Sequence, residues 1–230
     1  MPGKSDVLKE APVLDKGYVQ LIDVMGSDQR VVDAARVSTG SASDEERDKE
    51  LIFYLMEHRH ESPFEKIVFE FNVKCPIFVA RQWMRHRIGS YNERSARYRV
   101  FDMEYYVPNL GDIPEDFGPE DIDSYVKCMN EAYAVYERML AKVASKAETR
   151  SRAREVFRGL LGTAYYTEFF WTVNFRSLMN FLQLRLDEKA QAEIRRYAEA
   201  INDMIPEYIP WSCEAFRKFI LNAGAIRQES

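Results

Sequence analysis

Every second residue from Ile67 to Cys75 is apolar, and Glu70, Asn72 and Lys74 lie between them. An alternation of period two places all of the apolar side chains on one face of an extended strand. A helix would scatter the same side chains around its axis. We therefore expect a strand at 67–75 that buries one face, and a fold that contains a sheet.

The remaining patterns predict mainly helices. Apolar residues at helical spacing predict a long amphipathic helix at about 120–146, and aromatic residues with threonine predict a second long strand at 165–173. Further helices are expected near 28–37, 43–56, 76–87, 149–160, 175–185, 188–204 and 210–222, further strands at 18–25 and 103–107, and a loop at 89–98. Strands and helices do not alternate as in βαβ units. The predicted fold class is therefore α+β, helix-rich, with a small antiparallel or mixed sheet.

The length of 230 residues fits one large domain or two small ones, and we expect a single domain over 1–230. Residues 1–15 are expected to be a loose leader. Residues 108–119 contain three prolines and two glycines, so they are expected to form a flexible insertion.

Composition excludes several classes of protein. With 46% hydrophobic and 30% charged residues, the chain is globular rather than disordered. No apolar run is long enough to span a membrane, and the start of the chain lacks the apolar centre of an export signal, so a cytoplasmic protein is expected. Three scattered cysteines argue against a disulfide framework, and three histidines argue against a metal site.

The densest chemical feature is the segment from Arg85 to Arg99, in which five arginines and His86 surround a single acid. Arginine binds phosphate through a planar fork of donors, and the Ser, Asn and Glu residues of the segment add groups that can recognise a nucleobase. One alternative is a solvated basic face that makes surface ion pairs. Another is a nucleic-acid-binding surface, although a pI of about 5.4 argues against a broad basic footprint.

Two other segments carry polar residues in suggestive positions. If the chain is helical after Asn174, Arg176 and Asn180 share a face and Arg185 can point into a site at the helix end; the alternative is a purely structural role. In the segment 58–65, two histidines lie two positions apart. Histidines at that spacing do not converge on a metal ion when helical, and a favourable interaction with the helix dipole explains them equally well.

No catalytic nucleophile stands out. Cys75 ends the predicted strand at 67–75, Cys128 lies on a predicted helix and Cys213 lies in an aromatic cluster, so we interpret all three as structural. Ser95 has no neighbouring base that could activate its hydroxyl.

Taken together, these segments resemble the flavin-dependent thymidylate synthases. The family signature is Arg-His-Arg, two residues, Ser, one residue, Asn-Glu, one residue, Ser, one residue, Arg-Tyr. This chain matches it at Arg85-His86-Arg87, Ser90, Asn92-Glu93, Ser95 and Arg97-Tyr98. Supporting segments follow in the family's order at 35–38, 60–65, 78–83, 169–174, 176–181 and 184–185. The resemblance covers about 17–222, and a match of this length is rarely accidental.

The resemblance implies the fold of that family and a specific reaction. Such enzymes methylate dUMP to dTMP, with methylenetetrahydrofolate as carbon donor and FAD reduced by NADPH as hydride source. They form homotetramers in which each site is built from several subunits. Neither a nucleic acid nor a membrane is implied as a partner.

The resemblance also implies roles for individual residues. Those expected around dUMP are Gln82, Arg85, Glu93, Arg94, Ser95, Ala96, Arg97, Arg158 and Arg185. Those expected to hold FAD are Ser62, Arg85, His86, Arg87, Glu93, Asn174, Arg176 and Asn180, with His60 near the flavin or the folate. Arg185 would be the catalytic residue, because a nearby cation favours the N3-ionised form of uracil. The added charge makes the C5 carbon of the ring a better nucleophile, so no cysteine is required.

Some positions depart from the family pattern. Lys66 and Lys189 stand where histidine is usual, and Gly162 stands where proline is common. Arg158 is placed only by its distance from the aromatic run at 169–171. Two further interpretations stay open at this point: a flavoprotein of the same fold with another methyl acceptor or oxidase behaviour, and a structural homo-oligomer without activity.

Overall fold

The computed structural model describes residues 7–37, 44–95, 102–143 and 147–222. Ala96 and Arg97, both predicted to contact dUMP, lie outside these ranges. So does Ser43, the residue expected to open the second helix. That helix, α2 (Glu45–Glu57), begins instead after Asp44, whose side chain accepts a hydrogen bond from the backbone N–H of Arg47.

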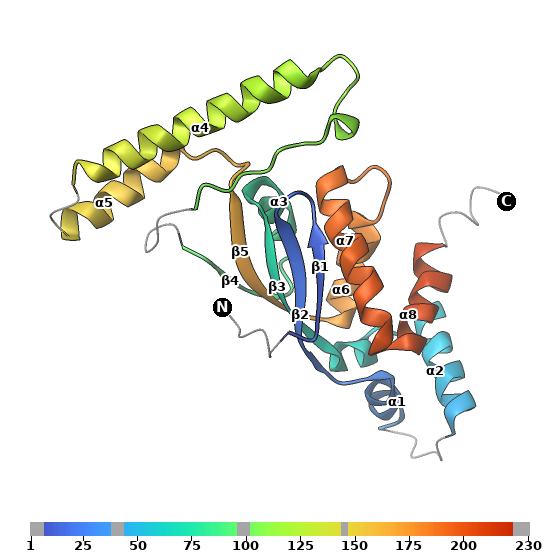
Figure 1. Ribbon diagram of the computed structural model, residues 1–230. Helices are drawn as coiled ribbons and strands as arrows, with labels where there is room; N and C mark the ends of the chain where they lie inside the picture. The colour runs from blue at the N-terminus through green and yellow to red at the C-terminus, as the bar shows by residue number, and fades with distance from the viewer. Residues whose placement is uncertain (1–6, 38–43, 96–101, 144–146, 223–230) are drawn as a thin grey trace.

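A five-stranded antiparallel sheet lies at the centre of the molecule, in the order β1-β2-β3-β5-β4 (Figure 1). Its strands are β1 (Lys9–Val13), β2 (Gly17–Met25), β3 (Val68–Pro76), β4 (Ser90–Glu93) and β5 (Tyr166–Asn174). The middle strand, β3, pairs with β2 on one side and with β5 on the other. The predicted α+β class with a small sheet is confirmed, and all pairings between the strands are antiparallel.

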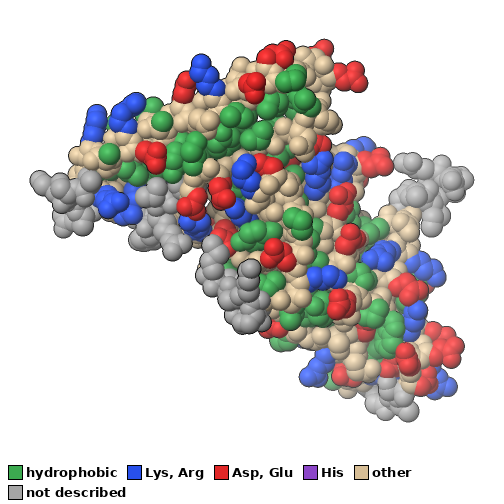
Figure 2. Space-filling view, in the orientation of Figure 1, with side chains coloured by type: hydrophobic (Ala, Val, Ile, Leu, Met, Phe, Trp, Pro, Cys, Tyr) green, Lys and Arg blue, Asp and Glu red, His purple; other side chains and the backbone are tan. Residues whose placement is uncertain are grey.

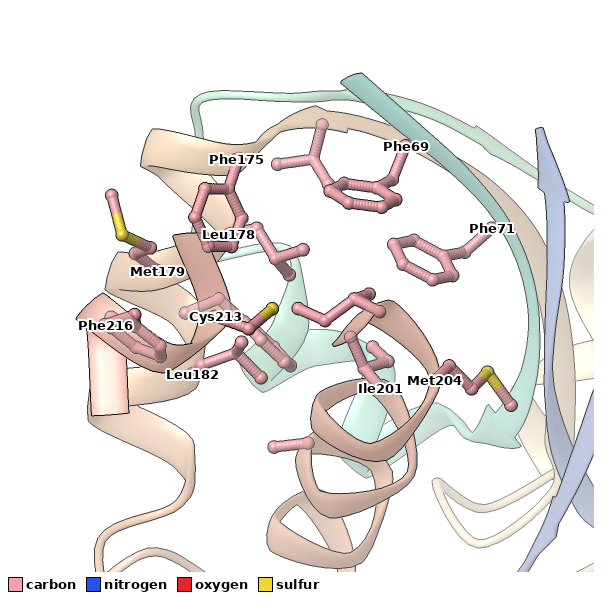
Figure 3. Packing of buried hydrophobic residues seen from close by; sticks show 14 of the residues in the cluster. Phe69, Phe71, Phe175, Leu178, Met179, Leu182, Ile201, Met204, Cys213 and Phe216 are labelled. Atoms are coloured by element: carbon pink, nitrogen blue, oxygen red, sulfur yellow. The ribbon is translucent and has the colours of Figure 1, made fainter. Parts of the chain in front are cut away.

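The alternation of β3 builds the main core. Phe69 and Phe71 are fully buried and point toward α6 (Phe175–Arg185) and α7 (Ala192–Met204), which cover one face of the sheet (Figure 3). The helix α8 (Pro210–Phe216) packs behind them and adds Cys213 and Phe216 to the same cluster. Burial of large aromatic side chains is the main favourable contribution to folding of such a layer.

One buried carboxylate joins two helices that are far apart in the sequence. Asp28 lies in the first turn of α1 (Asp28–Arg36) and accepts hydrogen bonds from the backbone N–H groups of Trp211 and Ser212, at 2.8 and 3.0 Å. Those N–H groups have no partner within α8 because they belong to its first turn. Asp28 therefore caps α8 from a distant part of the sequence.

A helical arm projects from the sheet beside β5 (Figure 1). It consists of α4 (Pro119–Ala141), α5 (Ala147–Phe157) and the 3-10 turn η4 (Arg158–Leu160). A second apolar cluster, separate from the main core, packs the arm against the body through Tyr133, Tyr136 and Tyr165. Further apolar side chains lie on the surface of the arm that faces the viewer in Figure 2. In α5, Val156 is 51% exposed.

The remaining elements connect these layers. They are α3 (Ile77–Trp83), the 3-10 turns η2 (Ser62–Lys66), η3 (Leu110–Asp112) and η5 (Ile205–Glu207), and the π-helical turn η6 (Arg217–Leu221). In the proline-rich segment 108–119, η3 is tied to α7 by an ion pair in which Arg196 donates to Asp112 at 3.0 Å.

Three expectations were wrong at the edges of the sheet. Residues 9–13 are not part of a loose leader but form β1, although Pro12 lacks the N–H that a central strand would need; an edge strand tolerates this. Residues 90–93 form β4 rather than part of a loop. In place of the strand expected at 103–107, Tyr105 makes a single bridge to Tyr165.

Candidate active site

The arginine segment is held by α3, a turn and β4. The turn follows α3 directly, with the backbone N–H of His86 donating to the Trp83 carbonyl at 3.0 Å. Tyr91 on β4 donates its hydroxyl to the carbonyl of His86 at 2.7 Å, and its ring stacks on Trp171 of β5 with 6.1 Å between centroids. The turn that carries Arg85, His86 and Arg87 is therefore fastened to the sheet.

The second polar segment enters the same region through α6. This helix begins at Phe175 because the Asn174 side chain accepts a hydrogen bond from the backbone N–H of Ser177, at 2.9 Å. Arg176 stands in its first turn and Arg185 in its last. The predicted helix at 175–185 is confirmed.

The two segments line one open cleft of about 680 Å³, a volume within the range of small-molecule and cofactor sites. Its lining consists of Glu61, Glu65, Arg85, His86, Arg87, Ile88, Asn174, Arg176, Ser177, Asn180, Leu184 and Arg185. Four arginines face two carboxylates there, so the cleft has the cationic excess that attracts an anionic ligand.

Arg185 and His86 are in direct contact within the cleft. The Nε of Arg185 donates to Nε2 of His86 at 3.1 Å, and one terminal nitrogen of the guanidinium donates to the Gln82 carbonyl at 3.4 Å. Burial, together with the charge of Arg185, lowers the pKa of His86 to about 4. Burial also lowers the pKa of Arg185, although a guanidinium keeps its charge at any physiological pH.

The other end of the cleft holds an ion-pair cluster. Arg176 donates to Glu65 at 2.6 Å and to Glu61 at 3.3 Å. These hydrogen bonds raise the pKa of Arg176. Glu61 also lies 3.4 Å from Arg59, so one carboxylate is shared by two guanidinium groups. Because all of these side chains are at least partly exposed, a stronger anion could displace the carboxylates at small cost.

A second pocket, of about 480 Å³, lies beside η4. It is lined by Ile77, Glu93, Arg94, Ser95, Arg158, Gly159 and Leu161. Glu93 is fixed by the Thr167 hydroxyl, which donates to it at 2.7 Å, and Arg94 pairs with Asp102 at 2.9 Å. The pocket thus combines two arginines and one carboxylate with an apolar wall.

The predicted nucleotide residues fall into two groups within one chain. Arg85 and Arg185 line the cleft, and Gln82 reaches it through its carbonyl, while its side chain bonds to Gln191. Glu93, Arg94, Ser95 and Arg158 line the second pocket, and among the residues that the structure describes the two linings have none in common.

Most of the residues predicted to hold FAD lie together in the cleft. These are Arg85, His86, Arg87, Asn174, Arg176 and Asn180. Glu93, predicted for both ligands, lies in the second pocket instead. Ser62 and His60 are both exposed and line neither pocket. The His60 ring stands edge-on to Tyr54 with 6.1 Å between centroids.

Some residues that shape the site were not selected from the sequence. Glu61 and Glu65 lie in the segment 60–65 and pair with Arg176. Their negative charge was the sequence feature that could have indicated this pairing. Tyr91 lies inside the signature at a position that the signature leaves open, so nothing marked its contact with the His86 carbonyl. Ile88, Ser177 and Leu184 complete the lining and carry no sequence signal.

The part of the chain that the structure describes has neither a helix that could span a membrane nor a group of metal ligands. No helix among them is both long and apolar enough to cross a membrane. No three His, Cys, Asp or Glu side chains among them are grouped so that they could hold a metal ion.

Comparisons with known proteins identify the family of this chain. The family model for thymidylate synthase complementing protein matches residues 20–211. A flavin-dependent thymidylate synthase of Thermotoga neapolitana is 50% identical over 94% of this chain and 98% of its own length. One from Thermosipho melanesiensis is 45% identical over 95% of this chain and 98% of its own length.

A solved structure has the same fold. It is a UMP/dUMP methylase, PolB, from Streptomyces cacaoi, bound with 5-Br dUMP. It superposes with a TM-score of 0.80 at 33% identity and covers 92% of this chain and 99% of its own. The family match spans both segments that line the cleft and reaches from β2 to α8. The chain belongs to the flavin-dependent thymidylate synthase family of enzymes.

Proposed function

We propose that this chain, as a single catalytic domain, methylates dUMP to dTMP, with methylenetetrahydrofolate as carbon donor and FAD reduced by NADPH as hydride source. The observation that carries the proposal is the meeting of His86 and Arg185, 99 positions apart in the chain, in one cationic cleft. The names of the relatives support the reaction, and the 5-Br dUMP bound to the solved relative supports a uridine nucleotide as substrate.

The hydrogen-bond donors that line the cleft suit the diphosphate and the ring system of a flavin dinucleotide. Arg85, Arg87 and Arg176 can neutralise a diphosphate, and the side-chain amides of Asn174 and Asn180 can serve the polar edge of a ring system. Glu61 and Glu65 occupy Arg176 until such an anion arrives. When bound, the flavin would supply the hydride that completes the methyl group.

Arg185 is the residue we assign to activation of the uracil ring. Its guanidinium is partly buried in the cleft, where burial weakens the competition from water. A fixed cation near the pyrimidine lowers the pKa of ring N3 and stabilises its ionised form. The negative charge then reaches C5, which can attack the carbon donor without a covalent bond to the protein.

The second pocket suits the phosphate of the nucleotide. Arg94 and Arg158 provide cationic donors, and Ser95 adds a hydroxyl and a backbone N–H. Because this pocket and the cleft share no lining residue within the described ranges, we infer that a complete site combines the cleft of one subunit with the second pocket of another. A homotetramer with shared sites would provide this arrangement, and the exposed apolar side chains of the arm offer contact surface for it (Figure 2).

A cytoplasmic location is part of the same proposal. Cys75, Cys128 and Cys213 are all free thiols. A reducing compartment keeps thiols in this form, and folate and nicotinamide substrates are available there.

One alternative methyl acceptor has a specific observation in its favour. The solved relative is named a methylase of UMP as well as dUMP. Side-by-side assays with the two nucleotides separate the possibilities. We expect dUMP to give the higher kcat/KM, and a preference for UMP would replace the deoxynucleotide in the proposal.

The deciding experiment is a visible absorption spectrum of the purified protein, before and after dUMP is added. We expect a flavin spectrum that changes with the nucleotide, followed by methylation of labelled dUMP when methylenetetrahydrofolate and NADPH are supplied. A protein that takes up no added FAD would refute the proposed cofactor. Bound flavin with no methyl transfer would refute the proposed reaction.

A further inference from the structure

The contact between Arg185 and His86 fixes the protonation state of the histidine. A guanidinium has only donors, so the His86 Nε2 atom that receives Arg185 Nε at 3.1 Å must be an acceptor. The imidazole is therefore neutral, with its proton on Nδ1. Burial and the neighbouring positive charge favour the same state, since both lower the pKa of His86.

His86 itself is held from three directions. Its backbone N–H donates to the Trp83 carbonyl at 3.0 Å, and the Tyr91 hydroxyl donates to its carbonyl at 2.7 Å. The imidazole ring stands edge-on to Phe181, with centroids 5.0 Å apart. Because Phe181 is fully buried on α6, the ring rests against a rigid surface.

This rigid ring limits the orientations open to Arg185. The guanidinium is planar, so two hydrogen bonds to fixed acceptors define its plane. Nε is taken by His86, and one hydrogen of a terminal nitrogen is taken by the Gln82 carbonyl. The remaining N–H groups of the two terminal nitrogens are available to a ligand in the cleft.

We propose that His86 is a positioning residue for Arg185: by accepting the Nε hydrogen bond, it holds the guanidinium in the orientation that faces the uracil ring. The proposal rests on the proposed function, because it assumes that Arg185 acts on uracil. It gives His86 a role beyond contact with the flavin. The required property of the side chain is a neutral acceptor at the position of Nε2.

Two amide variants that differ by one methylene test this requirement. His86→Gln can place its carbonyl oxygen near the position of Nε2, whereas the amide of His86→Asn is one atom too short. We expect the kcat of His86→Asn to be about 100-fold lower than that of His86→Gln, the effect of misplacing a catalytic group by about 1 Å. Both variants alter the same predicted flavin contact, so kcat is expressed per bound flavin, and the difference between the variants should fall on kcat more than on KM for dUMP.

A double-variant cycle tests whether His86 acts through Arg185. In an Arg185→Ala background, His86→Asn should cause no further loss of kcat, because the group that it positions is already gone. Equal and independent losses in the cycle would overturn the proposal. So would full kcat in His86→Asn, or loss of flavin from both amide variants, which would make His86 a flavin contact only.

The failure of the proposed function has a different signature. A wild-type protein that binds flavin but does not methylate dUMP contradicts the proposed function, and the inference with it. Normal wild-type activity with an unaffected His86→Asn contradicts the positioning role alone. If His86→Asn does not fold, His86→Phe provides a second variant without an acceptor, and its expected kcat loss is the same.

Discussion

Arg185 is a partly buried cation at the end of α6 whose guanidinium contacts His86 and the Gln82 carbonyl. We expect Arg185→Ala to retain bound flavin and to lose about 10²–10³-fold in kcat, as for removal of one donor that stabilises a developing anion. Steady-state kinetics and the flavin spectrum measure the two effects. Arg87→Ala, in the arginine turn, is the comparison variant and should weaken flavin binding. Loss of flavin from Arg185→Ala with nucleotide chemistry intact would contradict the assignment.

His86 also predicts a pH effect on stability. Its pKa is lowered from the ordinary 6.5 to about 4 in the folded protein. Between these values the unfolded chain binds a proton that the folded chain does not, so the free energy of unfolding falls as the pH is lowered through this window. Thermal unfolding at pH 7 and pH 4.5 should show a larger decrease in Tm for wild type than for His86→Gln. Equal decreases in the two proteins would mean that His86 is not held neutral.

At the scale of single residues, the sequence predicted the site residues that belong to a motif. It missed the residues that reach the site only through the fold. The signature predicted Arg85, His86 and Arg87, and all three line the cleft. It could not separate Glu93 from them, because the chain turns into β4 after Ile88 and carries Glu93 toward the second pocket. The pairing of Arg176 with Glu65 was also out of reach, since it depends on how η2 meets the start of α6.

At the scale of elements, the turn that carries Arg85, His86 and Arg87 packs closely against β5, and the contact leaves no room for a larger side chain at Gly89. A Cβ atom at Gly89 would lie 2.7 Å from Nε1 of Trp171, a side chain that is fully buried and has no space to move. We expect Gly89→Ala to lower the free energy of unfolding by about 1–3 kcal/mol, as for overpacking of a filled core. Thermal or urea unfolding would measure the change.

The matched control is Gly111→Ala. A Cβ at Gly111 meets no atom within 4 Å, so its stability should stay close to wild type. If both variants behave alike, the close approach of Gly89 to Trp171 does not limit the structure. Flavin binding gives a second measurement, because displacement of Gly89 would also shift Arg87.

The strands that were predicted well are the long inner ones, whose own residues show that they are buried. β3 and β5 are long strands in the inner part of the sheet. The alternation of β3 and the aromatic and threonine residues of β5 identified them without knowledge of the partner strands. β1 and β4 are edge strands of five and four residues. So short an edge strand is defined by the hydrogen bonds it makes to a neighbour, and those are not visible in its own composition.

For the whole molecule, the separation of the two pockets predicts complementation between inactive variants. Arg158→Ala alters the second pocket and Arg185→Ala alters the cleft. If each site draws these residues from different subunits, co-expressed variants should form mixed assemblies in which about a quarter of the sites contain both native arginines. Two affinity tags would isolate the mixed assemblies for assay. No recovery of activity in them would place both residues in the site of a single subunit.

The cap that Asp28 makes on α8 also sets the order in which a new chain can fold. Its partners, Trp211 and Ser212, are 183 and 184 positions away, so α8 must be synthesised before the contact can form. The helices that cover Phe69 and Phe71 are likewise made about 100 residues or more after those side chains, since α6 begins at Phe175 and α7 at Ala192. Until then the apolar face of β2 and β3 stays open to water, and folding dominated by such distant contacts is slow. We therefore expect the nascent chain to bind chaperones that shield apolar surface, and we expect a chain truncated before α8 to aggregate instead of folding.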